Sequence, residues 1–141
     1  MNKLLRVAMG YLMLISAPVL AASGSWSDTQ RGVTLQNRGV MASSAPLAAP
    51  QSSPLRQRAS ATITTVSWNY RLTGPRPAGL QVSLCNTTNR CVALDADSGQ
   101  TRSFYGQAAI SPMRLVYFVP GKGAMNPPLR VLSNQVIVNY Q

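Results

Sequence analysis

Apolar side chains recur at every second position in much of this chain, and outside the first 21 residues no stretch shows a helical period. The clearest example follows a β-branched run at 62–65, where apolar residues stand at Val66, Trp68, Tyr70 and Leu72. Successive side chains of a strand point to opposite faces, so this pattern indicates a strand with one buried face. The chain is therefore predicted to be all-β, with Trp68 and Tyr70 in its core.

Further segments have strand patterns of their own. Residues 80–84 and 92–94 alternate, 115–119 is continuously apolar as in a strand covered on both faces, and 135–140 alternates again after a weaker start at Val131. Turn-forming residues separate them at 74–79, 95–99, 120–123 and 126–128. Several short strands in about 120 residues predict one domain, 22–141, built as a β-sandwich or flattened barrel of mostly antiparallel strands.

The turn at 95–99 holds two aspartates and resembles part of a calcium loop. The chain has no Glu, and two carboxylates are too few for the six to eight oxygens that calcium prefers. We expect a hairpin turn with Asp and Gly in their usual places.

The segment 40–60 does not fit the sheet. It carries prolines among Ala, Ser and Gln, so it is predicted to be an extended arm or long loop. One interpretation is a bare linker. The other is partner contact, because a loop this long in a small domain is often functional, and the candidate residues are Pro46, Pro50, Pro54, Arg56 and Arg58.

Residues 1–21 have the pattern of an export signal. Lys3 and Arg6 precede an uncharged apolar run, and Val19-Leu20-Ala21 offers the small residues that signal peptidase cleavage needs. The run is short for a membrane span, and no later segment approaches that length. The mature protein is predicted to begin at Ala22 or Ser23, in the periplasm if the source is bacterial.

Cys85 and Cys91 bracket five turn-prone residues between two strand-like segments. Export to an oxidising compartment makes a disulfide the default for such a pair, ahead of a redox-active or metal-binding pair. We expect a hairpin tied at its neck by a structural bond.

Composition argues against several functions. The chain has no His and no Glu, which removes the usual general bases, carboxylate pairs and metal ligands. Without Lys3 and Arg6, the 13 basic side chains fall to 11, and the 3 Asp leave a net charge of +8. The arginines are spread without a cluster or interleaved aromatics, which disfavours nucleic acid as a partner. We predict a binding or shielding protein, not an enzyme, that needs no cofactor or metal.

An ordered set of short motifs carries a family resemblance. The set runs from Gly32-Val33-Thr34-Leu35, Ser43-Ser44-Ala45-Pro46-Leu47 and Trp68-Asn69-Tyr70-Arg71-Leu72-Thr73-Gly74-Pro75 through Arg90-Cys91-Val92 and Val119-Pro120-Gly121 to Asn134-Gln135-Val136-Ile137-Val138-Asn139-Tyr140. No single piece is specific. Together and in this order, they resemble the family of the flagellar periplasmic protein FlhE.

The resemblance implies a periplasmic accessory of the flagellar system with flagellar rod or export-gate proteins as partners. Such a protein would act as a chaperone-like factor that prevents misassembly in the periplasm, or as a plug that limits proton leak through the export gate. The family brings no catalytic residues. The alternative from the residues alone is a carbohydrate- or cell-wall-binding β-sandwich, which would need exposed aromatics and amide or acidic groups converging on one face. The oligomeric state is left open.

Overall fold

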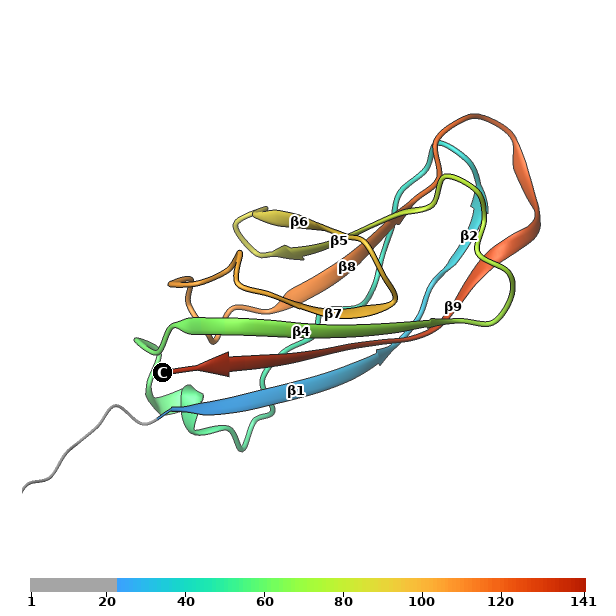
Figure 1. The fold of residues 1–141 in the computed structure, drawn as a ribbon. Coiled ribbons are helices and arrows are strands. Elements are labelled where there is room, and N and C mark those ends of the chain that lie inside the picture. Colours follow the sequence, from blue (N-terminus) through green and yellow to red (C-terminus); the bar gives the residue numbers. More distant parts are fainter. Residues whose placement is uncertain (1–22) are drawn as a thin grey trace, which may run out of the picture.

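The computed structural model describes residues 23–141, which form two antiparallel sheets arranged as two layers (Figure 1). The predicted all-β class is confirmed. The signal peptide predicted for 1–21 lies outside the described residues. The elements are β1 (Gly24–Arg31), β2 (Thr34–Asn37), β3 (Ala42–Ser43), the 3-10 helix η2 (Pro54–Gln57), β4 (Ile63–Leu72), β5 (Gln81–Asn86), β6 (Cys91–Leu94), β7 (Ser98–Thr101), β8 (Met113–Phe118) and β9 (Ala124–Tyr140).

The larger sheet has the strand order β1-β9-β4-β7, and β2 pairs with the first half of β9. The last strand of the chain is thus central: Val138 lies between Trp26 of β1 and Val66 of β4. The alternation along β4 gives the strand the buried face that was predicted, because Val66, Trp68 and Tyr70 are all buried. The C-terminal strand predicted at 135–140 is confirmed as part of β9.

The smaller sheet has the order β3-β8-β5-β6. In this sheet β8 lies between two strands and buries four of its six residues, as its continuous apolar run predicts. β5 and β6 form the predicted hairpin, and Cys85 lies directly opposite Cys91 in its register.

The core lies between the two sheets and draws on both. Tyr70 of β4 and Tyr117 of β8 meet edge to face, with their ring centroids 5.7 Å apart. Trp26, whose packing the sequence leaves open, is 3% exposed, and its indole N–H donates to the Ala109 carbonyl at 2.8 Å. The first strand is therefore anchored by an aromatic side chain that belongs to the core.

Segment 40–60 follows the edge of the smaller sheet before it becomes a loop. β3 pairs with β8, and Leu47 forms a further bridge to Met113. Leu47, Ala49 and Leu55 are buried, so the segment packs against the body of the protein. Asp28 of β1 secures its middle by accepting a hydrogen bond from the Ala48 amide at 3.0 Å.

Two predicted turns are wrong. Residues 126–128 lie inside β9, at the point where its register with β2 shifts between Leu35 and Asn37. Proline has no N–H to donate, and such an irregular place in the ladder tolerates it because regular pairing is interrupted there. Residues 95–99 do not close a hairpin, because β6 belongs to the smaller sheet and β7 to the larger one. Gly99 is a strand residue opposite Trp68, and a Cβ there would lie 2.7 Å from the indole ring.

Across residues 23–141 no helix is long and apolar enough to span a membrane.

Candidate functional site

Three segments lie close together at the end of the molecule opposite the C-terminus: the loop after β2, the loop after β4 and the first residues of β9 (Figure 1). They surround a hollow of about 150 Å³, which we call the loop-end hollow. Four prolines and two arginines dominate its wall. Its lining residues are Arg38, Pro75, Arg76, Pro77, Ala78, Met125, Asn126, Pro127 and Pro128.

Arg76 is held in place by residues of the larger sheet and its connecting loop. Its Nη1 donates to the Tyr70 hydroxyl and to the Asp97 carboxylate, both at 2.9 Å. Its guanidinium carbon also lies 5.8 Å from the centroid of the Tyr70 ring. The hydrogen bond that Arg76 donates to the Tyr70 hydroxyl is the main reason that the pKa of Arg76 is raised above its ordinary value.

Arg38 enters the same hollow from the loop after β2. A Cβ on Gly121 would lie 3.3 Å from its Cδ, so the stem of Arg38 runs along that glycine. The glycine has a φ of +113°, a conformation that side-chain-bearing residues rarely adopt. Within 23–141 the Arg38 guanidinium has no hydrogen bond or ion pair, although its backbone amide donates to Gly123.

A buried polar chain supports this end of the core. The Tyr117 hydroxyl donates to the side-chain oxygen of Asn134, and the Asn134 amide donates to the Arg31 carbonyl at 3.2 Å. Asn134 is fully buried, and these bonds satisfy both ends of its side chain. Burial, as the largest cause, raises the pKa of both Tyr70 and Tyr117 above its ordinary value, so both phenols stay neutral.

The residues predicted for partner contact are only partly brought together. Pro54, Arg56 and Arg58 line a wide surface hollow of about 570 Å³ formed by residues 51–58, which we call the arm hollow. Pro50 adjoins it, since its carbonyl accepts from Arg56 Nε at 3.5 Å. Pro46 lies elsewhere, beside Arg114 in an apolar hollow of about 160 Å³.

Arg56 has a structural role in the arm. Besides its contact with Pro50, its Nη2 donates to the carbonyl of Ala49, so the guanidinium holds the loop around η2. Ser53 caps the same short helix by accepting from the Leu55 amide at 3.2 Å. Replacement of Arg56 will therefore disturb the loop as well as remove a charge.

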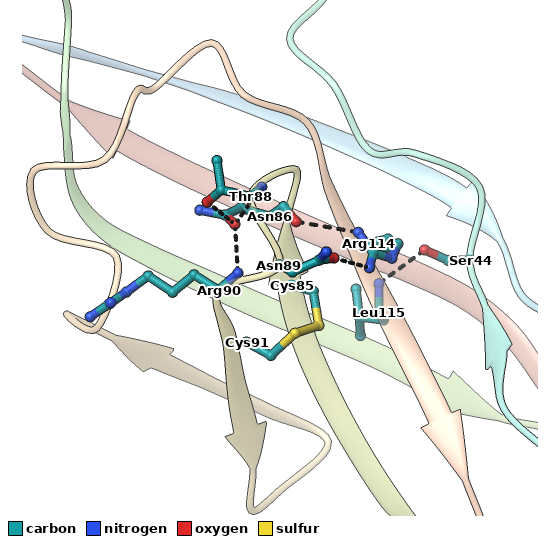
Figure 2. Close-up of a disulfide and its surroundings, with 9 residues drawn as sticks. All are labelled: Ser44, Cys85, Asn86, Thr88, Asn89, Arg90, Cys91, Arg114 and Leu115. Atoms are coloured by element: carbon teal, nitrogen blue, oxygen red, sulfur yellow. Dashed lines mark hydrogen bonds between the residues drawn. A yellow bond between two sulfur atoms is a disulfide. The ribbon is translucent and has the colours of Figure 1, made fainter.

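The predicted disulfide is present and closes the β5–β6 hairpin (Figure 2). The Asn86 side-chain oxygen organises the turn by accepting from the backbone amides of Thr88 and Arg90, each at 3.0 Å. Arg114 of β8 reaches across to the Asn86 carbonyl and the Asn89 side chain, as Figure 2 shows. The arginine is a structural tie between the turn and the neighbouring strand.

The loop-end hollow was not predicted from the sequence, because 74–79 and 126–128 have only the pattern of turns. Two signals were present: an arginine between two prolines at Pro75-Arg76-Pro77, and a second proline pair at Pro127-Pro128. The sequence could not show that Pro127 and Pro128 of β9 lie next to the loop that holds Pro75 and Pro77.

The carbohydrate-binding alternative is not supported. Such a site would present aromatic faces to solvent, but in the described part of the chain Tyr105 is the one aromatic among the large exposed apolar side chains. Nor do three or more His, Cys, Asp or Glu side chains gather into a possible metal site between residues 23 and 141.

Comparison with known proteins gives the family. The family model described as "Flagellar protein FlhE" matches residues 32–141. The chain belongs to the FlhE family. The flagellar protein FlhE of Salmonella typhimurium is 50% identical over 131 residues, covering 92% of this chain and 95% of the relative. The FlhE protein of Escherichia coli is 45% identical over 133 residues, covering 92% and 97%.

Solved structures agree with this fold. A crystal structure of FlhE has a TM-score of 0.78 at 50% identity, and the match covers 86% of this chain and 99% of that one. A serine protease of Aeromonas sobria has a TM-score of 0.61 at 11% identity, matched over 28% of its own length. That second likeness concerns the fold alone. The resemblance noted from the sequence is thus confirmed, and the flagellar association rests on the FlhE relatives.

Proposed function

We propose that this FlhE-family protein is an exported, non-enzymatic accessory of the flagellar system that acts by binding a flagellar component in the periplasm. Bound in a fixed ratio, it would act either as a chaperone-like factor against misassembly or as a plug that limits proton leak through the export gate. Rod proteins and export-gate proteins are the partners we propose. The disulfide is consistent with an oxidising compartment such as the periplasm.

One observation carries the proposal beyond the family name. Arginines line the three hollows described above: Arg38 and Arg76 the loop-end hollow, Arg56 and Arg58 the arm hollow, and Arg114 the hollow beside Pro46. With a predicted mature net charge of +8, the protein would attract acidic surfaces from a distance and dock them at these places. Binding through charged hollows needs no catalytic group.

The test is a crosslinking pull-down of tagged protein from the periplasm of flagellated cells. We expect rod or export-gate proteins in a constant ratio to the bait. Recovery of wall fragments alone, or of no flagellar protein, would overturn the proposal. Deletion of the gene then separates the two actions, because misassembled flagellar parts in the periplasm indicate the chaperone-like action and cytoplasmic acidification indicates the plug.

A charge reversal tests the arm hollow. Arg56→Glu with Arg58→Glu should weaken capture of the partner, whereas Arg71→Glu, an exposed arginine on β4, should not. Since Arg56 also holds the loop, a melting curve must accompany the experiment. If the folded double variant captures its partner as well as the wild type, the arm hollow is not the contact surface.

A further inference from the structure

The loop-end hollow contains more positive charge than its own surroundings neutralise. Arg76 pairs with Asp97 at 2.9 Å, and this is the only salt bridge among residues 23–141. Arg38 faces the same hollow with no partner in that part of the chain. Both bonds of Arg76 use Nη1, so a ligand could approach its guanidinium from the Nη2 side.

The walls restrict what can enter. Proline has no backbone N–H, so the four prolines of the lining donate no hydrogen bond and leave the two guanidinium groups as its charged donors. The volume of about 150 Å³ is below the 300 to 1,000 Å³ typical of pockets for cofactors and drug-sized molecules. A single side chain fits this size better than a nucleotide or an oligosaccharide.

The positions of the two arginines suit a carboxylate. A guanidinium presents its N–H groups in a planar fork that matches the two oxygens of a carboxylate. Arg76 is preorganised by Tyr70 and Asp97, which lowers the entropy cost of binding. Val40 and Met41 follow Arg38 in the same loop and are 53% and 68% exposed.

We propose that the loop-end hollow binds one carboxylate side chain of an acidic segment of a partner protein. Arg76 is the fixed donor, Arg38 is the second donor, and the prolines form a rigid wall. This inference rests on the proposed function in one respect, because the segment would belong to the flagellar component that the protein holds.

A titration with short peptides tests the site directly. The probe is hexaglutamate, acetylated and amidated at its ends, added to the ¹⁵N-labelled mature protein, with hexaglutamine and inorganic phosphate as comparisons. We expect saturable amide shifts confined to Arg38, Arg76, Ala78, Met125 and Asn126, and none with hexaglutamine. Shifts centred on the arm hollow, an equal response to phosphate, or no saturable binding would overturn the proposal.

Three variants sharpen the result. Arg38→Gln should weaken hexaglutamate binding about tenfold, the loss of roughly one charge-assisted hydrogen bond, without lowering the melting temperature. Arg76→Lys keeps the charge but not the fork and should also weaken binding. Arg71→Gln removes one positive charge from the exposed end of β4 and should bind as the wild type does. Equal weakening by Arg71→Gln would show that only net charge matters, and the site would be rejected.

The outcome is separable from that of the proposed function. If hexaglutamate does not bind at the hollow but the periplasmic pull-down still recovers a flagellar protein, the inference fails and the proposed function stands. If hexaglutamate binds there but the pull-down recovers no flagellar protein, the hollow is an acidic-segment site whose partner lies outside the flagellum.

Discussion

At the scale of single residues, the core depends on polar groups as well as apolar ones. Tyr117 is fully buried between the sheets, and its hydroxyl has one buried partner, Asn134. A buried phenolate would be costly, and burial raises the pKa of both Tyr117 and Tyr70. These two residues therefore make stability depend on pH in the alkaline range.

The direction follows from proton linkage. In the unfolded chain both tyrosines lose their protons near pH 10, whereas in the folded protein they retain them. The unfolded state then binds fewer protons, so the free energy of unfolding falls as pH rises above about 10. Urea titrations should show little change between about pH 6 and 9, because the chain has no His, and a decline above that range.

Tyr117→Phe separates this linkage from other effects of alkali. The variant should lose about 1 to 3 kcal/mol at neutral pH, because Asn134 is left with an unpaired buried oxygen. Its decline above pH 10 should be shallower than that of the wild type. Tyr105→Phe, at an exposed position, is the control and should change neither quantity. An equally steep alkaline decline in Tyr117→Phe would remove that tyrosine from the explanation.

At the scale of elements, sequence periodicity predicted the strands that bury one face or both. β4, β5, β6, β8 and the second half of β9 all have alternating or continuous apolar residues. β1 was not predicted because Trp26 is its one apolar residue with a large side chain. Its place in the sheet comes from pairing with β9 along its whole length, which is a tertiary effect that no local pattern carries.

Glycine and proline show why the rest could not be predicted. From its sequence neighbours Gly99 is predicted to lie in a turn. In the structure it lies in a strand, and its lack of a Cβ allows the Trp68 ring of the neighbouring strand to approach closely. Pro127 and Pro128 signal a break, but they lie at a register irregularity of a 17-residue strand. Pro127 and Pro128 also line the loop-end hollow, so this candidate site could not be predicted for the same reason.

The β5–β6 hairpin should tolerate loss of its disulfide. Cys85 and Cys91 are six positions apart and already paired in the strand register, so the bond closes a small loop. Replacing both with Ser should cost about 2 kcal/mol on the chain-entropy model. The measurement is urea unfolding of the double variant, with circular dichroism to check the fold. Loss of the folded state would show that the hairpin depends on the bond.

The C-terminal strand should be indispensable. Removal of 134–141 takes away the second half of β9, which lies between β1 and β4, and leaves two edges exposed, so we expect unfolding or aggregation. A milder pair tests the same strand. Val138→Ala, at a fully buried position, should lower stability by about 2 kcal/mol, and Ile137→Ala, on the opposite face, by much less. Equal costs, or a truncated protein with an unchanged melting temperature, would contradict the central place of β9.

At the scale of the whole molecule, charge is the dominant feature. After the predicted cleavage, 11 basic side chains face 3 acidic ones, and one salt bridge forms among residues 23–141. The positive side chains of the folded protein therefore repel one another, which lowers its stability. Salt should weaken this repulsion, because the Debye length is only about 8 Å at physiological ionic strength. Partner binding through arginines should respond in the opposite sense, since salt also screens attraction to an acidic surface.

The opposite effects of salt on stability and on binding can be measured in one series of salt concentrations. Between about 0.02 and 0.3 M sodium chloride we expect the melting temperature to rise by a few degrees, while the affinity for an acidic partner falls at least several-fold. Arg71→Gln removes one repelling charge and should raise the melting temperature at low salt, but it should leave the salt dependence of binding unchanged. Arg38→Gln should flatten the salt dependence of hexaglutamate binding, because one of the two screened contacts is gone. If affinity and melting temperature rose together with salt, binding would be driven by apolar contacts and not by the two arginines.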